Sequence, residues 1–121
     1  MAQHNQLGKR GEEVAENYLI HKGYHILERN WRSGKLELDL IADTPDNLVV
    51  IEVKTRRNSF FGNPEDAITK DKIRRIVKAT QDYIKKHNVR LPVRFDIITI
   101  LGAQAPYHVE HYPNAFYPPI S

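Results

Sequence analysis

Two acidic residues and a lysine lie on neighbouring candidate strands of this sequence. Asp39 belongs to the alternating segment 36–41, and Glu52 and Lys54 follow the apolar run 48–51. A short turn between the two segments predicts a hairpin, so we expect Asp39 and Glu52 to face one cleft. Two close carboxylates repel each other unless a cation lies between them, and Mg²⁺ suits such a site because it takes few protein carboxylates. Lys54 can then position the attacking water and offset charge on a phosphate.

The same residues also have a plainer interpretation. With a period of two, the leucines of segment 36–41 point to one face and Glu37, Asp39 and Ile41 to the other, as in any half-exposed strand. Asp39 can also form a buried cluster of ion pairs with the two charges of the next strand. Because buried ion pairs are often neutral or costly, stability is a weak reason for such a cluster. The residues alone leave both the metal site and the ion-pair cluster open.

The elements that must position these side chains follow from hydrophobic periodicity and turn residues. Residues 48–51 are apolar at four consecutive positions, which predicts a central strand covered on both faces. Asn63 and Pro64 have the pattern of an N-cap and first helical residue. The patterns predict helices over residues 5–22 and 64–87, strands over 24–31, 35–42, 48–54 and 93–101, and a short edge strand over 107–112.

Length and composition restrict the class of protein. With 121 residues we expect one domain over residues 1–121, with an irregular tail over 113–121 that contains three prolines. The absence of cysteine excludes disulfides, zinc knuckles, iron–sulfur clusters and thiol nucleophiles. No run approaches 18 apolar residues, and the first residues lack the apolar region of a signal peptide. The sequence therefore predicts a soluble, cytoplasmic protein without a membrane partner.

The positive charge is concentrated in one part of the chain. The net charge is +3, but residues 54–90 alone carry 11 basic and 4 acidic residues. Such a stretch favours a polyanionic partner, although a solvated helix face would have the same composition. Phe60 and Phe61 lie within it and can stack on a base or belong to the core. The candidate nucleic-acid-binding residues are Arg56, Arg57, Lys70, Lys72, Arg74, Arg75 and Lys78.

Several short motifs together resemble one family. Asp39 followed by Glu52, Val53 and Lys54 is similar to the D…(D/E)-x-K signature of the restriction-endonuclease-like superfamily. Over nearly the whole chain the sequence resembles the YraN-like family of small proteins, which is related in pattern to Holliday junction resolvases. The motifs that carry this resemblance are Gly11-Glu12 and segments 29–32, 37–42, 50–56, 61–62, 94–97 and 114–116.

The resemblance implies an α/β fold, with a restriction-endonuclease-like mixed β-sheet flanked by helices in the order αβββαβ(β). It also implies a site that uses Mg²⁺ or Mn²⁺ to cut phosphodiesters. Asp39 and Glu52 match the metal ligands, to which we add the Val53 carbonyl, and Lys54 matches the catalytic lysine. Glu12 matches a helix acid that some members add to the site. The leading hypothesis is a metal-dependent endonuclease acting on DNA, including branched or flapped structures; symmetric junction cutting would require a homodimer.

Two further hypotheses remain open. A non-catalytic nucleic-acid-binding module on the same scaffold would bind with a salt dependence set by the helix cations and would need no metal. A protein-interaction domain would use the basic helix to bind an acidic partner. We expect Arg94 and Asp96 to form a structural ion pair. Glu37 either supports the metal site or is solvated or forms a salt bridge. The histidines of segment 108–111 do not have the spacing of a helical zinc site.

Overall fold

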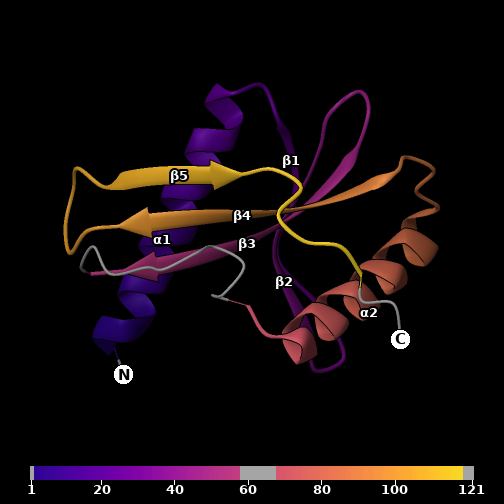
Figure 1. Ribbon diagram of the computed structural model, residues 1–121, viewed down its shortest axis with the longest axis horizontal. Coiled ribbons are helices and arrows are strands. Elements are labelled where there is room, and N and C mark those ends of the chain that lie inside the picture. The colour runs from indigo at the N-terminus through magenta and orange to yellow at the C-terminus, as the bar shows by residue number, and fades with distance from the viewer. Residues whose placement is uncertain (1, 58–67, 119–121) are drawn as a thin grey trace.

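The computed structural model describes residues 2–57 and 68–118, with side chains from residue 8 onward, and its element order matches the predicted αβββαβ(β). Figure 1 shows these elements. The helices are α1 (Ala2–His21) and α2 (Lys70–His87). The strands are β1 (His25–Ser33), β2 (Leu36–Asp43), β3 (Leu48–Arg56), β4 (Val93–Leu101) and β5 (His108–Tyr112). No described helix is long and apolar enough to cross a membrane.

The strands form one mixed sheet in the order β1-β2-β3-β4-β5. β3 and β4 are parallel, with α2 in the connection between them, and the other neighbouring pairs are antiparallel. Central β3 has its first five residues buried, which confirms the expectation from the apolar run at 48–51. β5 is an edge strand, as the sequence predicts.

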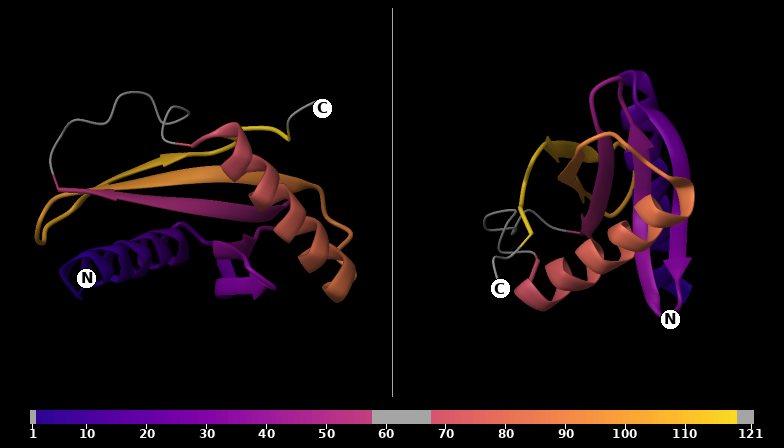
Figure 2. Two further views of the ribbon diagram at one scale, coloured as in Figure 1. Left: turned by 90° about the horizontal axis from the view of Figure 1, so that it is seen from below. Right: turned by 90° about the vertical axis from the view of Figure 1, so that its right-hand side faces the viewer.

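Each face of the sheet carries one core and one helix. Figure 2 shows α1 along one face and α2 crossing the other. On the α1 face, Leu19 packs with Ile51 of β3. On the α2 face, Ile76 packs with Val50 of β3 and its neighbours. Because alternate residues of β3 point to opposite faces, Glu52 and Lys54 share the face of Val50 and lie on the side of α2.

Both helices differ from prediction at their N-terminal ends. α1 begins at Ala2, earlier than the expected residue 5. α2 begins at Lys70, where extended Thr69 is the N-cap and its Oγ1 accepts the N–H of Lys72 at 3.1 Å. The predicted cap, Asn63, lies outside the described residues, but the extended Thr69 shows that no continuous helix runs from residue 64 to residue 87. Thr69 caps the helix directly before the amphipathic residues of α2.

The predicted alternation of β2 is wrong around Asp39. Leu38 packs with Ile41 in the core below α2, whereas Leu40 packs in the core below α1. The two leucines therefore lie on opposite faces, although their spacing predicts a shared one. The pairing of β2 with β3 ends at Leu40, and in β1 the residue Asn30, with a φ of 48°, lies between the partners of Leu38 and Leu40. Strand β2 thus leaves the plane of β3 next to Asp39.

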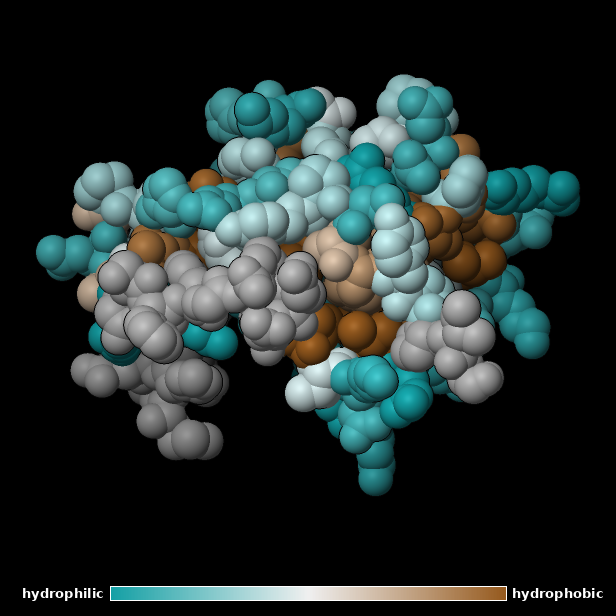
Figure 3. All heavy atoms as spheres, in the orientation of Figure 1, coloured by the Kyte–Doolittle hydropathy of each residue, from teal (hydrophilic) through white to brown (hydrophobic). Residues whose placement is uncertain are grey.

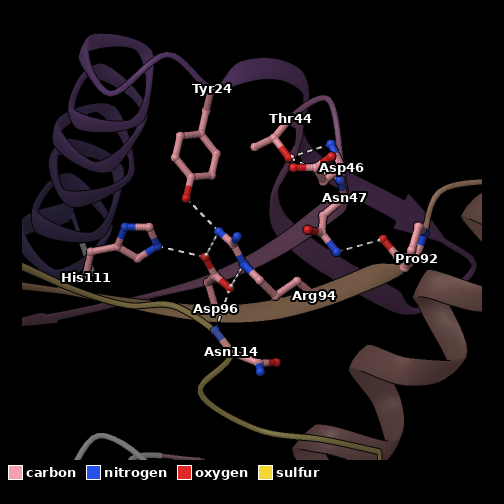
Figure 4. Close-up of polar contacts among 9 residues, drawn as sticks. All are labelled: Tyr24, Thr44, Asp46, Asn47, Pro92, Arg94, Asp96, His111 and Asn114. Atoms are coloured by element: carbon pink, nitrogen blue, oxygen red, sulfur yellow. Dashed lines mark hydrogen bonds and ion pairs between the residues drawn. The ribbon is translucent and has the colours of Figure 1, made fainter.

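A buried polar cluster joins β4 to the C-terminal segment (Figure 4). Asp96, fully buried, accepts hydrogen bonds from Arg94 Nε at 3.0 Å and Nη2 at 2.9 Å. His111 Nε2 at 2.7 Å and the N–H of Asn114 at 2.9 Å donate to the same carboxylate, and Arg94 Nη2 donates to the Tyr24 hydroxyl at 2.6 Å. Although burial raises the pKa of Asp96, these donors outweigh it and hold the pKa below its usual range. The expected structural pairing of Arg94 and Asp96 is confirmed.

Candidate functional site

The candidate site lies where β2 separates from β3. The last pair in their ladder is Leu40 with Ile51. Asp39, the residue before Leu40 in β2, has no partner in this ladder, and its side chain contacts β3 instead. Asp39 Oδ2 accepts the N–H of Val53 at 2.9 Å. The carboxylate is therefore fixed against the open edge of β3 by a hydrogen bond to the backbone.

Glu52 is the most deeply buried acid at this point, with 2% of its side chain exposed. Its Oε1 lies 3.7 Å from Nζ of Lys72 on α2. Its Oε2 is buried and has no hydrogen-bond partner among the described residues. A buried carboxylate oxygen without a donor is costly, because it has lost its water and gained nothing in exchange.

Burial raises the pKa of both carboxyl groups, and the charge of Asp39 raises that of Glu52 further. Burial, followed by the negative charge of Asp39, raises the pKa of Glu52 from its ordinary 4.5 to about 8. Burial also raises the pKa of Asp39, against the lowering effects of the Val53 N–H and of Lys72. Near neutral pH the pair therefore retains a proton unless additional positive charge is supplied. Such a site favours binding of a cation.

Lys54 contributes positive charge to the same place. It lies two residues beyond Glu52 on β3 and is half-buried. Its charge lowers the pKa values of both Asp39 and Glu52, although by less than that of Lys72. The structure thus brings Asp39, Glu52 and Lys54 together, as the motif predicts.

Glu12 approaches Asp39 from the other helix. Burial raises the pKa of Glu12, Asp39 raises it further, and a hydrogen bond with Asn30 partly compensates. Glu12 therefore adds negative charge beside Asp39. Glu37 also lies close enough to raise the pKa of Asp39, and its Oε1 is 3.6 Å from Arg32 Nη2. Over residues 2–57 and 68–118, no three acidic or histidine side chains are arranged as a ready metal-binding group.

Sequence reasoning missed the position of Lys72. The sequence predicts a contact of Lys72 with nucleic acid, and the structure in addition places Lys72 against Glu52. The helical spacing contains the signal, because Lys72 lies four residues before Ile76, which is followed by buried Thr80 and Tyr83 on one stripe of α2. A lysine at the end of a buried stripe points toward the sheet, where it meets the carboxylates.

The other candidate cations differ in their surroundings. Arg74 pairs with Asp71 at 2.9 Å, and Lys78 pairs with Asp82 at 3.1 Å. The side chains of Arg56, Arg57, Lys70 and Arg75 are exposed. Phe60 and Phe61 lie outside the described residues. Hydrophilic side chains, teal in Figure 3, project at the lower edge of that view, over α2 and the turn between β1 and β2.

A groove lies between that turn and α2, beside the carboxylates. It has a volume of about 400 Å³. Two of its residues, Glu37 and Lys72, also act on the electrostatics of Asp39. The groove is lined by Lys35, Leu36, Glu37, Lys72, Arg75 and Ile76.

A comparison with protein families shows which family the chain belongs to. The model of the family described as "Uncharacterised protein family UPF0102" matches residues 11–100. The chain belongs to the UPF0102 family. This is the YraN-like family that the motifs resemble, so the expected membership is confirmed. The match includes Glu12, Asp39, Glu52, Lys54 and Lys72.

Similar UPF0102 proteins occur in several bacteria. The chain is 59% identical to one from Phocaeicola vulgatus over 120 residues, which make up 99% of each chain. It is 48% identical to one from Bacteroides thetaiotaomicron, again over 99% of each chain. A UPF0102 protein of Porphyromonas gingivalis is 44% identical over 118 residues, covering 96% of this chain and 87% of the relative. The UPF0102 relatives thus match this chain over almost its whole length.

Proposed function

We propose that this UPF0102 protein is a metal-dependent endonuclease that hydrolyses phosphodiester bonds in DNA. The observation that carries the proposal is the buried Glu52 carboxylate, whose Oε2 has no partner in the described structure while Asp39 and two lysines surround it. A cation between the two carboxylates would complete the coordination of that oxygen. We also propose that the mixed sheet is a variant of the restriction-endonuclease-like fold.

The donor set suits Mg²⁺ or Mn²⁺. Carboxylate and carbonyl oxygens are the ligands that these hard ions prefer. The N–H of Val53 points toward Asp39, and the N–H and C=O of one strand residue point to the same side. The Val53 carbonyl therefore faces the gap left by β2. Asp39, Glu52 and the Val53 carbonyl would hold the metal.

The residues around the carboxylates divide the catalytic roles. When bound, the metal supplies a Lewis acid that polarises a phosphate oxygen and a bound water. Lys54 orients the attacking water and offsets the charge that develops on the phosphate. Glu12 and Asp39 together attract the cation from the α1 side. Lys72, which contacts Glu52, also lines the neighbouring groove, and water would enter the site from there.

Nucleic acid would approach over the basic side of the site. Its phosphates would be held by the predicted contacts, which are Arg56, Arg57, Lys70, Lys72, Arg74, Arg75 and Lys78. Branched or flapped DNA is the proposed substrate, and a homodimer would supply the two active sites that symmetric cutting requires. The chain contains no cysteine, which is compatible with action in the reducing cytoplasm.

A second candidate is a nucleic-acid-binding module without catalysis. It is favoured by the contact of Lys72 with Glu52, because the lysine already neutralises part of the charge that a metal would neutralise. This module would bind DNA with the salt dependence of the basic residues, and divalent metal would have no effect on it.

A cleavage assay separates the two candidates. The protein is incubated with linear, flapped and four-way-junction DNA in Mg²⁺, Mn²⁺ or EDTA, and the Glu52→Gln variant is the control. We expect the wild-type protein to form metal-dependent products from at least one substrate. Glu52→Gln should bind the same DNA and form no products. Binding of DNA without products in either metal would instead support the binding module.

A further inference from the structure

We propose that the groove between the β1–β2 turn and α2 binds the phosphates of one nucleic-acid strand next to the scissile position. The inference deepens the proposed function, on which it rests, by naming the path of the strand. It also adds Lys35, which lies in the turn between β1 and β2, to the binding residues.

Cations from two separate elements converge on this groove. Lys35 comes from the turn, where Gly34 has a φ of 60°, and Lys72 and Arg75 come from the first turns of α2. Leu36 and Ile76 form its apolar walls. A volume of about 400 Å³ falls in the range of sites that accept ligand-sized groups. A short stretch of sugar-phosphate backbone therefore fits its size and charge.

The charges that line the groove are available to a ligand. Lys35 and Arg75 are exposed, and neither forms an ion pair within the described residues. The acid of the groove, Glu37, is already paired with Arg32 outside it. Arg74 is next to Arg75 in the chain, but its guanidinium is held by Asp71. The groove thus keeps a net positive charge that its own acid does not cancel.

Lys72 connects the groove to the carboxylates. It lines the groove and also lies 3.7 Å from Glu52. A phosphate bound by Lys35 and Arg75 would therefore lie directly beside the site of Asp39 and Glu52. A guanidinium such as that of Arg75 binds phosphate through two parallel hydrogen bonds, which favours a phosphodiester strand.

The test uses binding without metal, so that cleavage does not interfere. A fluorescein-labelled oligothymidine is titrated with protein in EDTA at several salt concentrations, and anisotropy reports binding. We expect Arg75→Ala and Lys35→Ala each to weaken binding roughly tenfold at low salt and to reduce the log–log salt slope by about 0.7. Arg74→Ala should have a smaller effect, because Asp71 already holds that guanidinium. Lys86→Ala, at the far end of α2, is the control for loss of one charge.

The outcomes separate this inference from the proposed function. Equal losses for Arg75→Ala, Arg74→Ala and Lys86→Ala would show a diffuse basic surface and overturn the groove. Equal competition by poly-glutamate would overturn it as well, since it would show an acidic-peptide site. If the wild-type protein cuts DNA but the groove variants bind DNA normally, the groove is refuted and the nuclease proposal stands. A groove confirmed in a protein that cuts no DNA would support the binding module.

Discussion

The Asp39 carboxylate accepts the N–H of Val53 at the first position where β2 and β3 no longer pair. A side chain thus replaces a backbone acceptor in the sheet. This hydrogen bond holds the Asp39 carboxylate beside Glu52, although the repulsion between the two negative charges opposes the arrangement. The hydrogen bond therefore links the geometry of the sheet to the chemistry of the site.

Two substitutions at Asp39 should separate structure from metal binding. Asp39→Asn keeps an oxygen that can accept the Val53 N–H, so we expect near-native stability but loss of Mn²⁺ binding and of cleavage. Asp39→Ala leaves that N–H without an acceptor and should cost about 1–3 kcal/mol of unfolding free energy as well. Urea denaturation and calorimetric Mn²⁺ titration measure the two effects. Normal Mn²⁺ binding by Asp39→Asn would contradict its role as a ligand.

Stability should fall as pH rises. The pKa of Glu52 is about 8 in the folded protein, against 4.5 ordinarily, so in that window the folded state holds a proton that the unfolded chain has lost. The unfolding free energy therefore decreases between about pH 4.5 and pH 8 and levels off above it. Glu52→Gln removes this contribution and should flatten the profile measured in urea. Equal slopes for the two proteins would show that the pKa of Glu52 is not raised.

Removal of Lys72 should strengthen metal binding. Its ammonium competes with a cation for Glu52 at 3.7 Å. At about pH 9, where Glu52 of the wild-type protein is mostly ionised, we expect Lys72→Met to bind Mn²⁺ up to about tenfold more tightly. The gain is limited because the lysine charge is partly screened and because its loss also raises the pKa of Glu52. Lys86→Met is the matched control. Unchanged affinity in Lys72→Met would mean that the lysine and the metal do not share the carboxylate.

The close approach of α1 to β3 at Gly11 can be tested through stability. A Cβ on Gly11 would overlap with Thr55 Cγ2, so Thr55 must rotate or α1 must move outward. We expect Gly11→Ala to cost about 1–3 kcal/mol of unfolding free energy. Gly8 has open space around it, and Gly8→Ala should be neutral or stabilising by up to about 1 kcal/mol. Thr55→Ala should restore stability to the Gly11→Ala variant, and failure to do so would refute this contact.

The sequence predicts the order of elements because hydrophobic periodicity is local. Val93–Leu101 and the end of α2 at His87 agree with prediction for this reason. The faces of Leu38 and Leu40 could not be predicted, because they depend on where β2 leaves β3, a property of long-range pairing. The motif predicts that Asp39, Glu52 and Lys54 lie close together, and in the structure they do. The contact of Lys72 with Glu52 follows from its position on the buried stripe of α2, which its charge alone does not indicate.

The most direct test of the central claim is the anomalous diffraction of Mn²⁺-soaked crystals at a pH above 8. We predict one strong peak between Asp39 and Glu52, within about 2.3 Å of their carboxylate oxygens and of the Val53 carbonyl, with the Lys72 ammonium moved away from Glu52. A map without a peak at this position, in which Lys72 still contacts Glu52, would contradict the metal site and leave the ion-pair cluster as the explanation.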